Sequence, residues 1–255
     1  MNVAKDPNHI RPVTAYDDTV SLSLLQMSAF IFTGIACIIL SALIWRERTF
    51  ELSLTLVHNS IYTHGYTTLF QMITQYGMSL ILLIYVVFFL HTYQTDRYAH
   101  NTSVYVCAIL LFIIAGLSVD IIKTMIDKAR PSEILPGLTA LTQSPHTASY
   151  PSAHTTKAIA LVLPFLFLTH KRSCAYLITT TLSLCIALLI AYSRIALQKH
   201  FLSDVIAGIG CAIICVPLAV YATRRIMKKH HSRFTPRTLV VFYIVCGILL
   251  AFISF

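Results

Sequence analysis

Long apolar segments separated by short polar ones dominate the pattern of this chain. A helix that crosses a bilayer needs about 20 mostly apolar residues, and several segments meet or nearly meet this length. They are residues 22–45, 67–91, 104–126, 154–170, 174–193, 202–223 and 238–254. Backbone polar groups in lipid must be hydrogen-bonded within their own segment. The pattern therefore predicts an all-α membrane protein with seven spanning helices.

The segment between the first two apolar runs has a mixed character. Residues 46–66 read RERTFELSLTLVHNSIYTHGY, which is too polar to span a membrane and too apolar for a free loop. This alternation is typical of an amphipathic helix that lies at a membrane surface. Residues 1–20 are polar and lack the basic start and apolar core of a cleavable signal peptide. We therefore expect the first span to remain in the mature protein.

The composition and the placement of charge agree with a membrane protein. The chain is 56% hydrophobic and 11% charged, whereas soluble domains carry about 25% charged residues. The net charge of +9 comes mostly from residues at the ends of apolar runs, so we expect contact with membrane lipids and no nucleic-acid partner. Six Lys or Arg residues lie in the segment 224–237.

The basic residues also predict an orientation. With a cytoplasmic N-terminus, Arg97, the turn 170–172 and the basic loop 224–237 all fall on the cytoplasmic side, as the positive-inside rule requires. The polar ends after the first, third and fifth spans then face the periplasm, a lumen or the outside.

The seven cysteines have no CxxC spacing, and nearly all lie inside apolar runs. Disulfides or a zinc site are not expected from this pattern. We interpret these cysteines as small apolar residues that pack between helices.

Most of the remaining polar chemistry falls in three short segments. They are Lys123 to Pro131 at the end of the third span, Tyr150 to His154 before the fourth, and Ser193 to Asp204 between the fifth and sixth. In a chain that runs alternately up and down, these three positions share one membrane face. We therefore expect the three segments to meet at one rim.

This rim would bring together Lys123, Arg130 and Arg194. Crowded cations repel each other unless an anion joins them, and arginine matches phosphate oxygens in pairs. Ser152 stands where a helix N-cap belongs, and helix N-termini bind anions through free N–H groups. These features predict a phosphate site.

Two histidines complete the predicted site. His200 and Asp204 are four residues apart, so one helical turn would place them on one face. A carboxylate on one ring nitrogen fixes the tautomer and leaves the other nitrogen free to attack. His154 could then protonate the leaving oxygen as a general acid.

Each feature also has a simpler interpretation. Lys123 could pair with Asp120 or Asp127. Arg130 and Pro131 could mark an ordinary helix stop, and His200 with Asp204 could form an ion pair at the membrane interface. We favour the phosphate site over these simpler interpretations because all three segments are expected on the same membrane face.

Taken together, the three segments resemble the signature of the type 2 phosphatidic acid phosphatase superfamily, whose elements are K-x6-RP, PSGH and SR-x5-H-x3-D. The first and third elements match in full, and the second has Ala153 in place of glycine. The resemblance covers roughly residues 104–215, and the segment 46–66 is similar to the surface helix of many members. It implies a six-helix core, here residues 21–223, to which the span in 238–255 would be added.

The resemblance also implies a mechanism and a set of roles. A phosphohistidine forms on His200, which Asp204 orients, and His154 is the general acid. No metal or other cofactor takes part. The residues that would bind the phosphate are Lys123, Arg130, Ser152, the backbone N–H of Ala153, and Arg194.

The function expected is that of a membrane lipid phosphatase, in a bacterial inner membrane with its site facing outward. Candidate substrates are a prenyl diphosphate such as undecaprenyl diphosphate, phosphatidylglycerophosphate, phosphatidic acid or lipid A. The loop 132–150 carries one charged residue, Glu133, which favours a small head group such as a prenyl diphosphate. A lipid phosphotransferase, and a non-enzymatic transporter or scaffold with a relict site, stay open as alternatives. The sequence leaves the oligomeric state and the role of His146 undetermined.

Overall fold

A computed structural model describes residues 20–61, 64–92, 98–135, 147–168, 174–230 and 235–253. The described residues form helices and no strand. The helices are α1 (Leu24–Arg46), α2 (Arg48–Ile61), α3 (His64–Thr92), α4 (Tyr98–Met125), α5 (Pro131–Ile134), α6 (Ala153–Phe167), α7 (Cys174–Ala196), α8 (Leu202–Ile214), α9 (Val216–His230) and α10 (Pro236–Ile253). The basic turn 170–172, Arg97 and His146 lie outside the described residues.

The predicted all-α membrane fold is confirmed. Five helical stretches are long and apolar enough to cross a membrane, and two shorter apolar helices, Ala153–Phe167 and Arg237–Phe252, accompany them. One of the five joins α8 and α9 across Cys215, which keeps a right-handed helical conformation. The sixth predicted span therefore continues to His230 instead of ending at residue 223. Its extension is rich in Arg, Lys and Met, which favour helix once the apolar part has started it.

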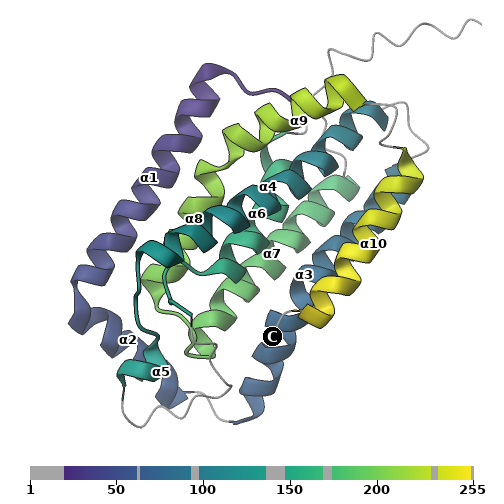
Figure 1. The fold of residues 1–255 in the computed structure, drawn as a ribbon. Helices are drawn as coiled ribbons and strands as arrows, with labels where there is room; N and C mark the ends of the chain where they lie inside the picture. Colours follow the sequence, from purple (N-terminus) through teal and green to yellow (C-terminus); the bar gives the residue numbers. More distant parts are fainter. Residues whose placement is uncertain are drawn as a thin grey trace, which may run out of the picture.

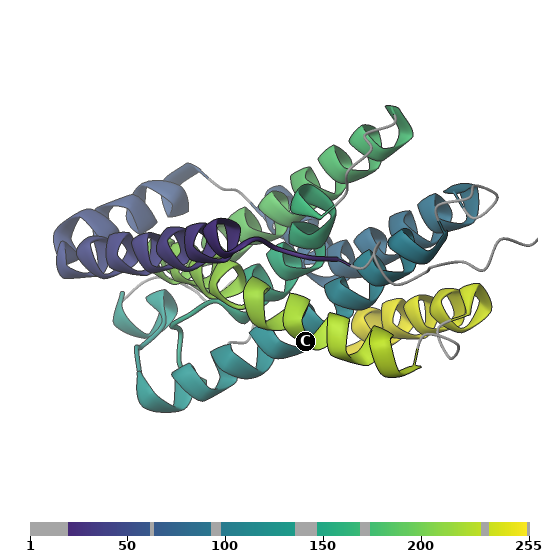
Figure 2. The same cartoon turned by 90° about the horizontal axis from the view of Figure 1, so that it is seen from above.

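The short helix α6 lies at the centre of the bundle, where it contacts α4, α7 and α8 (Figure 1). It is buried along nearly its whole length from Thr155 to Phe165. A helix that is apolar on all sides is buried on all sides, which explains why its pattern shows no polar face. Around it, α1 packs on α8, α3 packs on α7, and α10 packs on the outer side of α3 (Figure 2).

The two ends of the bundle differ in chemical character. The helices α2 and α5 and the turn between α7 and α8 lie at one end, and the basic end of α9 lies at the other (Figure 1). The helix α2 (Arg48–Ile61) confirms the helix expected within residues 46–66. Its buried side carries Glu51 and Thr55, and its exposed side carries Phe50 and Leu56.

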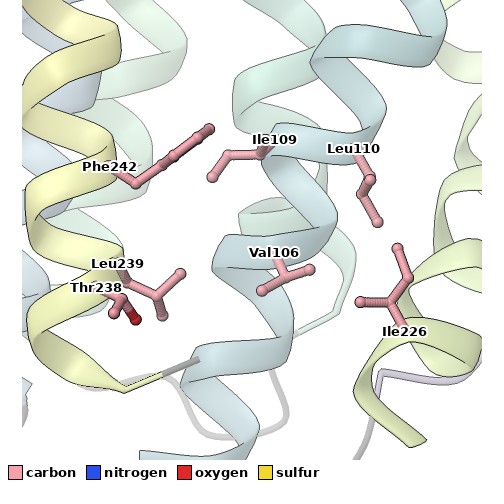
Figure 3. Close-up of a pocket in the computed structure, with 7 residues that line it drawn as sticks. All are labelled: Val106, Ile109, Leu110, Ile226, Thr238, Leu239 and Phe242. Atoms are coloured by element: carbon pink, nitrogen blue, oxygen red, sulfur yellow. The ribbon is translucent and has the colours of Figure 1, made fainter. Parts of the chain in front are cut away.

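An apolar groove lies between α4, α9 and α10 (Figure 3). Its lining consists of Val106, Ile109, Leu110, Ile226, Thr238, Leu239 and Phe242. This lining is apolar apart from one threonine, so it provides no charged group for phosphate chemistry. The seven cysteines carry free thiols.

Candidate active site

The three polar segments meet at the end of the bundle that holds α2 and α5. The backbone N–H of Ser152, before α6, donates to the backbone oxygen of Asp204 in α8 over 3.0 Å. Arg130 Nη1, after α4, donates to the backbone oxygen of Lys199 over 2.9 Å. Hydrogen bonds thus connect the first and second segments to the third, which runs from Ser193 to Asp204, as expected for a chain that runs up and down.

Arg130 and Lys123 hold the segment that precedes α6. Arg130 Nε and Nη2 donate to the backbone and side-chain oxygens of Thr147, each over 3.0 Å. Lys123 Nζ donates to the backbone oxygen of Ala148 over 2.9 Å. Burial lowers the pKa of the Arg130 guanidinium, which is 2% exposed, although Glu133 and Asp204 oppose this effect. Within the described residues, Lys123 forms no ion pair with Asp120 or Asp127, so that simpler interpretation is wrong.

Arg194 is buried near the end of α7 with an unsatisfied donor. Its side chain is 5% exposed, and its Nε has no hydrogen-bond partner among the described residues. Its backbone oxygen accepts hydrogen bonds from the backbone N–H groups of Lys199 and His200. Buried donors in folded proteins are nearly always paired. A guanidinium N–H left open beside the other cations is suited to an anion that enters the site.

His200 and Asp204 lie buried side by side. His200 Nδ1 is 3.5 Å from Asp204 Oδ2, and the two residues are 2% and 0% exposed. This burial excludes an ion pair exposed at the membrane interface. Burial is also the main reason that the pKa of His200 falls from 6.5 to about 3; Asp204 opposes the fall, whereas Arg194 adds to it. The imidazole is therefore neutral at physiological pH, with its Nδ1 directed at a carboxylate.

Asp204 has several further partners. Its Oδ2 accepts from Ser149 Oγ over 2.5 Å and from the backbone N–H of Phe201 over 2.9 Å. Its Oδ1 accepts from Lys128 Nζ over 2.9 Å. A carboxylate with hydrogen bonds on both oxygens is held in one orientation, and the side of the imidazole it faces is fixed with it.

The start of α6 forms another wall of the site. Ser152 is the N-cap residue of α6, as expected, but its side chain does not cap the helix and instead accepts from Thr155 Oγ1 over 3.0 Å. Ala153 and His154 begin the helix and are both partly exposed. The backbone N–H groups of a first helical turn have no partner within the helix, so this end of α6 can donate to an anion.

Lys199 extends the cationic surroundings. It is partly buried, and its pKa falls from 10.5 to about 8, because of burial first and then because of Arg194 and Arg130. The described residues contain no group of three or more His, Cys, Asp or Glu side chains that could hold a metal ion.

Several residues around this site, Lys199 among them, were missed from the sequence. Lys128 stands inside the spacer of the first motif, and Ser149 directly precedes the second. Glu51 comes from α2, and its Oε2 lies 3.2 Å from Lys128 Nζ. The charge of Lys128 could have indicated a paired residue, because a lysine that lies between two other cations needs carboxylates as partners. Glu51 gave no comparable signal, because a surface helix contains acidic residues for many reasons.

Comparisons with known proteins place the chain among membrane phosphatase folds. The family profile described as PAP2 superfamily matches residues 104–228. The crystal structure of a transmembrane PAP2-type phosphatidylglycerolphosphate phosphatase from Bacillus subtilis is similar, with a TM-score of 0.58 and 18% identity over 81% of this chain and 98% of that one. LpxE from Aquifex aeolicus is also similar, with a TM-score of 0.52 and 23% identity over 67% of this chain and 94% of that one. No curated protein matches the chain.

Proposed function

This chain belongs to the PAP2 superfamily, and on that premise we propose that it is a membrane phosphatase that hydrolyses a lipid phosphate through a phosphohistidine on His200. The observation that carries the proposal is the buried pair of His200 and Asp204 beside Arg194, whose Nε lacks a partner within the described residues. A neutral nucleophile held by a carboxylate and an unpaired guanidinium donor are the two parts that phosphoryl transfer needs.

The proposed reaction has two steps. The phosphate binds to Arg194, Lys123 and Arg130. It also binds to the start of α6, through the N-cap residue Ser152 and the N–H of Ala153. The free nitrogen of His200 forms a bond to phosphorus as the bond to the lipid oxygen breaks. His154 gives that oxygen its proton, and Asp204 stabilises the imidazolium that forms. Water then attacks phosphorus while His154 takes a proton from it, the bond between phosphorus and His200 breaks, and inorganic phosphate leaves.

We propose a lipid with a small head group, such as a prenyl diphosphate, as the substrate. The support is the segment 132–150, whose single charged residue, Glu133, offers little to bind a sugar or a large polar group. The test is release of inorganic phosphate by the purified protein from prenyl diphosphate, phosphatidylglycerophosphate, phosphatidic acid and lipid A, assayed side by side. No release from any of them would overturn the proposal. Analysis of the products with an acceptor lipid present separates hydrolysis from phosphate transfer.

We also propose that catalysis needs no metal. The cations Lys123, Arg130 and Arg194 supply the positive charge that a divalent ion supplies in other phosphatases. Activity is expected to survive treatment with EDTA. Complete loss of activity on chelation, with recovery on adding Mg²⁺ or Zn²⁺, would contradict this mechanism.

The orientation proposed is a site on the outer, non-cytoplasmic side of the membrane. It is supported by the basic end of α9, which lies at the other end of the bundle from α5 (Figure 1). A cysteine placed at Lys229 should react with an impermeant thiol reagent only after the cells are opened. Labelling of this cysteine in intact cells would show that the orientation is the opposite of the one proposed.

A further inference from the structure

A buried cluster of charges joins the helix α2 to the carboxylate beside His200. Lys128 Nζ lies 2.9 Å from Asp204 Oδ1 and 3.2 Å from Glu51 Oε2. The exposed fractions of Lys128, Glu51 and Asp204 are 6%, 3% and 0%. Charged side chains are rarely buried this completely unless they are paired, so the three groups form one unit.

Ser203 makes a second connection inside the same cluster. Its backbone N–H donates to Glu51 Oε1 over 3.1 Å, and its hydroxyl also bonds to that oxygen. Lys128 Nζ donates to Ser203 Oγ over 2.6 Å. Because Ser203 directly precedes Asp204, Glu51 is attached to the turn of α8 that carries the carboxylate.

Aromatic rings enclose the ammonium group of Lys128. Its Nζ lies 4.5 Å from the ring centroid of Phe201, 4.9 Å from Trp45 and 5.9 Å from Tyr150. Ring faces attract a cation, most strongly where water is excluded. The enclosure fixes the position of the ammonium group relative to Asp204.

The two oxygens of Asp204 are divided between different partners. Oδ2 faces His200, Ser149 and the backbone of Phe201, and Oδ1 faces Lys128. Lys128 therefore sets the rotation of the carboxylate. Lys128 alone would also neutralise Asp204, but Glu51 shares the same ammonium group. With two carboxylates and one ammonium group, the cluster keeps a net negative charge for the imidazolium that forms on His200.

We propose that Glu51 and Lys128 are positioning residues of the reaction, which hold Asp204 in orientation and preserve its negative charge, so that α2 is a working part of the active site. This inference rests on the function proposed above. Neither residue contacts the phosphate site in this role. Both act through Asp204, and their effect should appear in the chemical step and not in binding.

The test uses the full-length purified protein with Glu51→Gln, Lys128→Met and the double variant. Glu51→Gln leaves Lys128 to neutralise Asp204, and Lys128→Met leaves two buried carboxylates without a cation. In metal sites, mutation of a group that orients a liganding histidine lowers metal affinity or activity by about 10- to 100-fold. We expect each single variant to lower kcat within this range. The KM should change little, because Lys123, Arg130 and Arg194 remain.

The double variant separates positioning from general structural support. Removing both charges leaves Asp204 with Ser149 and the N–H of Phe201 and without an adjacent like charge. We therefore expect a higher kcat for the double variant than for Lys128→Met alone. If the role were purely structural, the loss of kcat in the double variant would equal or exceed the sum of the two single losses, expressed as free energies.

Inhibitors supply an independent measure of the same effect. Inorganic phosphate occupies the site in its ground state, and vanadate adopts the five-coordinate geometry of phosphoryl transfer, in which the histidine is an apical ligand. The Ki for phosphate should be unchanged in the single variants, and the Ki for vanadate should rise by about the factor by which kcat falls. If the Ki values for phosphate and vanadate rose by the same factor, the positioning role of Glu51 and Lys128 would be contradicted.

Two controls match the variants in the same part of the molecule. Glu47→Gln removes an exposed carboxylate just before α2, and Thr55→Val removes a hydroxyl on the buried side of α2 that bonds only within the helix. Both should retain wild-type kcat. If Lys128→Met fails to fold, Glu51→Gln alone decides: an unchanged kcat overturns the inference. A wild-type protein without activity on any lipid phosphate would instead refute the proposed function.

Discussion

Ser149 Oγ donates a hydrogen bond of 2.5 Å to Asp204 Oδ2, the same oxygen that faces His200 Nδ1 at 3.5 Å. Ser149 Oγ itself lies 3.3 Å from His200 Nδ1. The imidazole therefore faces both a hydroxyl and a carboxylate, which are hydrogen-bonded to each other. This geometry raises the question of which of the two partners is needed for turnover.

We predict that Asp204 is essential for turnover and that Ser149 contributes less. Ser149→Ala removes one hydrogen bond from Oδ2, which keeps the N–H of Phe201, and it lets Asp204 approach His200 more closely. The expected loss in kcat is about 10- to 100-fold, as for one hydrogen bond to a charged group. Asp204→Asn removes the charge that stabilises the imidazolium, and the same change in another enzyme class costs about 10⁴-fold.

The measurement is kcat on a lipid phosphate, together with trapping of acid-labile phosphate on the protein after rapid mixing with labelled substrate. His200→Ala is the reference, because without its nitrogen no phosphohistidine can form. If Ser149→Ala lowers kcat as far as Asp204→Asn does, Ser149 is the group that orients His200. If His200→Ala still traps phosphate, the nucleophile lies elsewhere.

The role of His154 can be tested through the leaving group. A lipid alkoxide or phosphate must be protonated as it departs, whereas p-nitrophenolate is stable without a proton. His154→Ala should therefore abolish turnover of the lipid and retain a larger share of the activity on p-nitrophenyl phosphate. Equal losses on the two substrates would show that His154 acts in another way, such as binding the phosphate.

Much of the fold follows from the sequence because the bilayer imposes a simple rule on apolar segments. Each predicted span has a helical counterpart, and the central position of α6 accounts for the absence of a polar face in its pattern. The sixth span was predicted to end at residue 223, where hydropathy falls, whereas the helix continues through Arg224 and Arg225 to His230. Hydropathy marks where a membrane ends, and helix propensity decides where a helix ends.

The convergence of the three motifs was also predictable, because an alternating chain places them at one end. The side-chain pairing was not. Lys128 and Lys123 are five residues apart, and only the three-dimensional structure shows that one lies between Glu51 and Asp204 and the other on the backbone of Ala148. Glu51 precedes Asp204 by more than 150 residues, and no local period connects them.

Lys199 predicts a pH dependence of phosphate binding. Its pKa is lowered to about 8 by burial and by Arg194 and Arg130, so its positive charge is lost as the pH rises through this value. The Ki for inorganic phosphate should therefore increase between about pH 7 and about pH 9 in the wild type. Lys199→Arg keeps its charge over this range and should give a flatter profile.

Lys229→Arg, near the basic end of α9, is the matched control for this experiment and should reproduce the wild-type profile. His200 is already neutral throughout this range because its pKa is about 3, so its titration does not contribute. A profile that is unchanged in Lys199→Arg would assign the pH dependence to another group.

The contact between α1 and α8 gives a prediction about stability. These helices approach closely at Gly34, where an added Cβ would lie 2.3 Å from Ile214 Cγ1 and 2.8 Å from the backbone oxygen of Gly210. The isoleucine can move, but the backbone of α8 cannot move without disturbing its other contacts. Overpacking of this kind costs about 1–3 kcal/mol, which exceeds the gain of about 0.5–1 kcal/mol for alanine over glycine within a helix.

We therefore expect Gly34→Ala to lower the thermal unfolding temperature of the protein in detergent. Gly247→Ala in α10 is the matched control, because its Cβ would meet Leu82 Cβ and the backbone oxygen of Ser79 only at 3.8 Å. That variant should be as stable as the wild type or slightly more stable. Ser41, two turns beyond Gly34 on α1, donates to the backbone oxygen of Ser203 over 2.8 Å, so a displaced α1 should also reduce kcat. Equal unfolding temperatures for the two glycine variants would mean that α1 can move away from α8 at little cost.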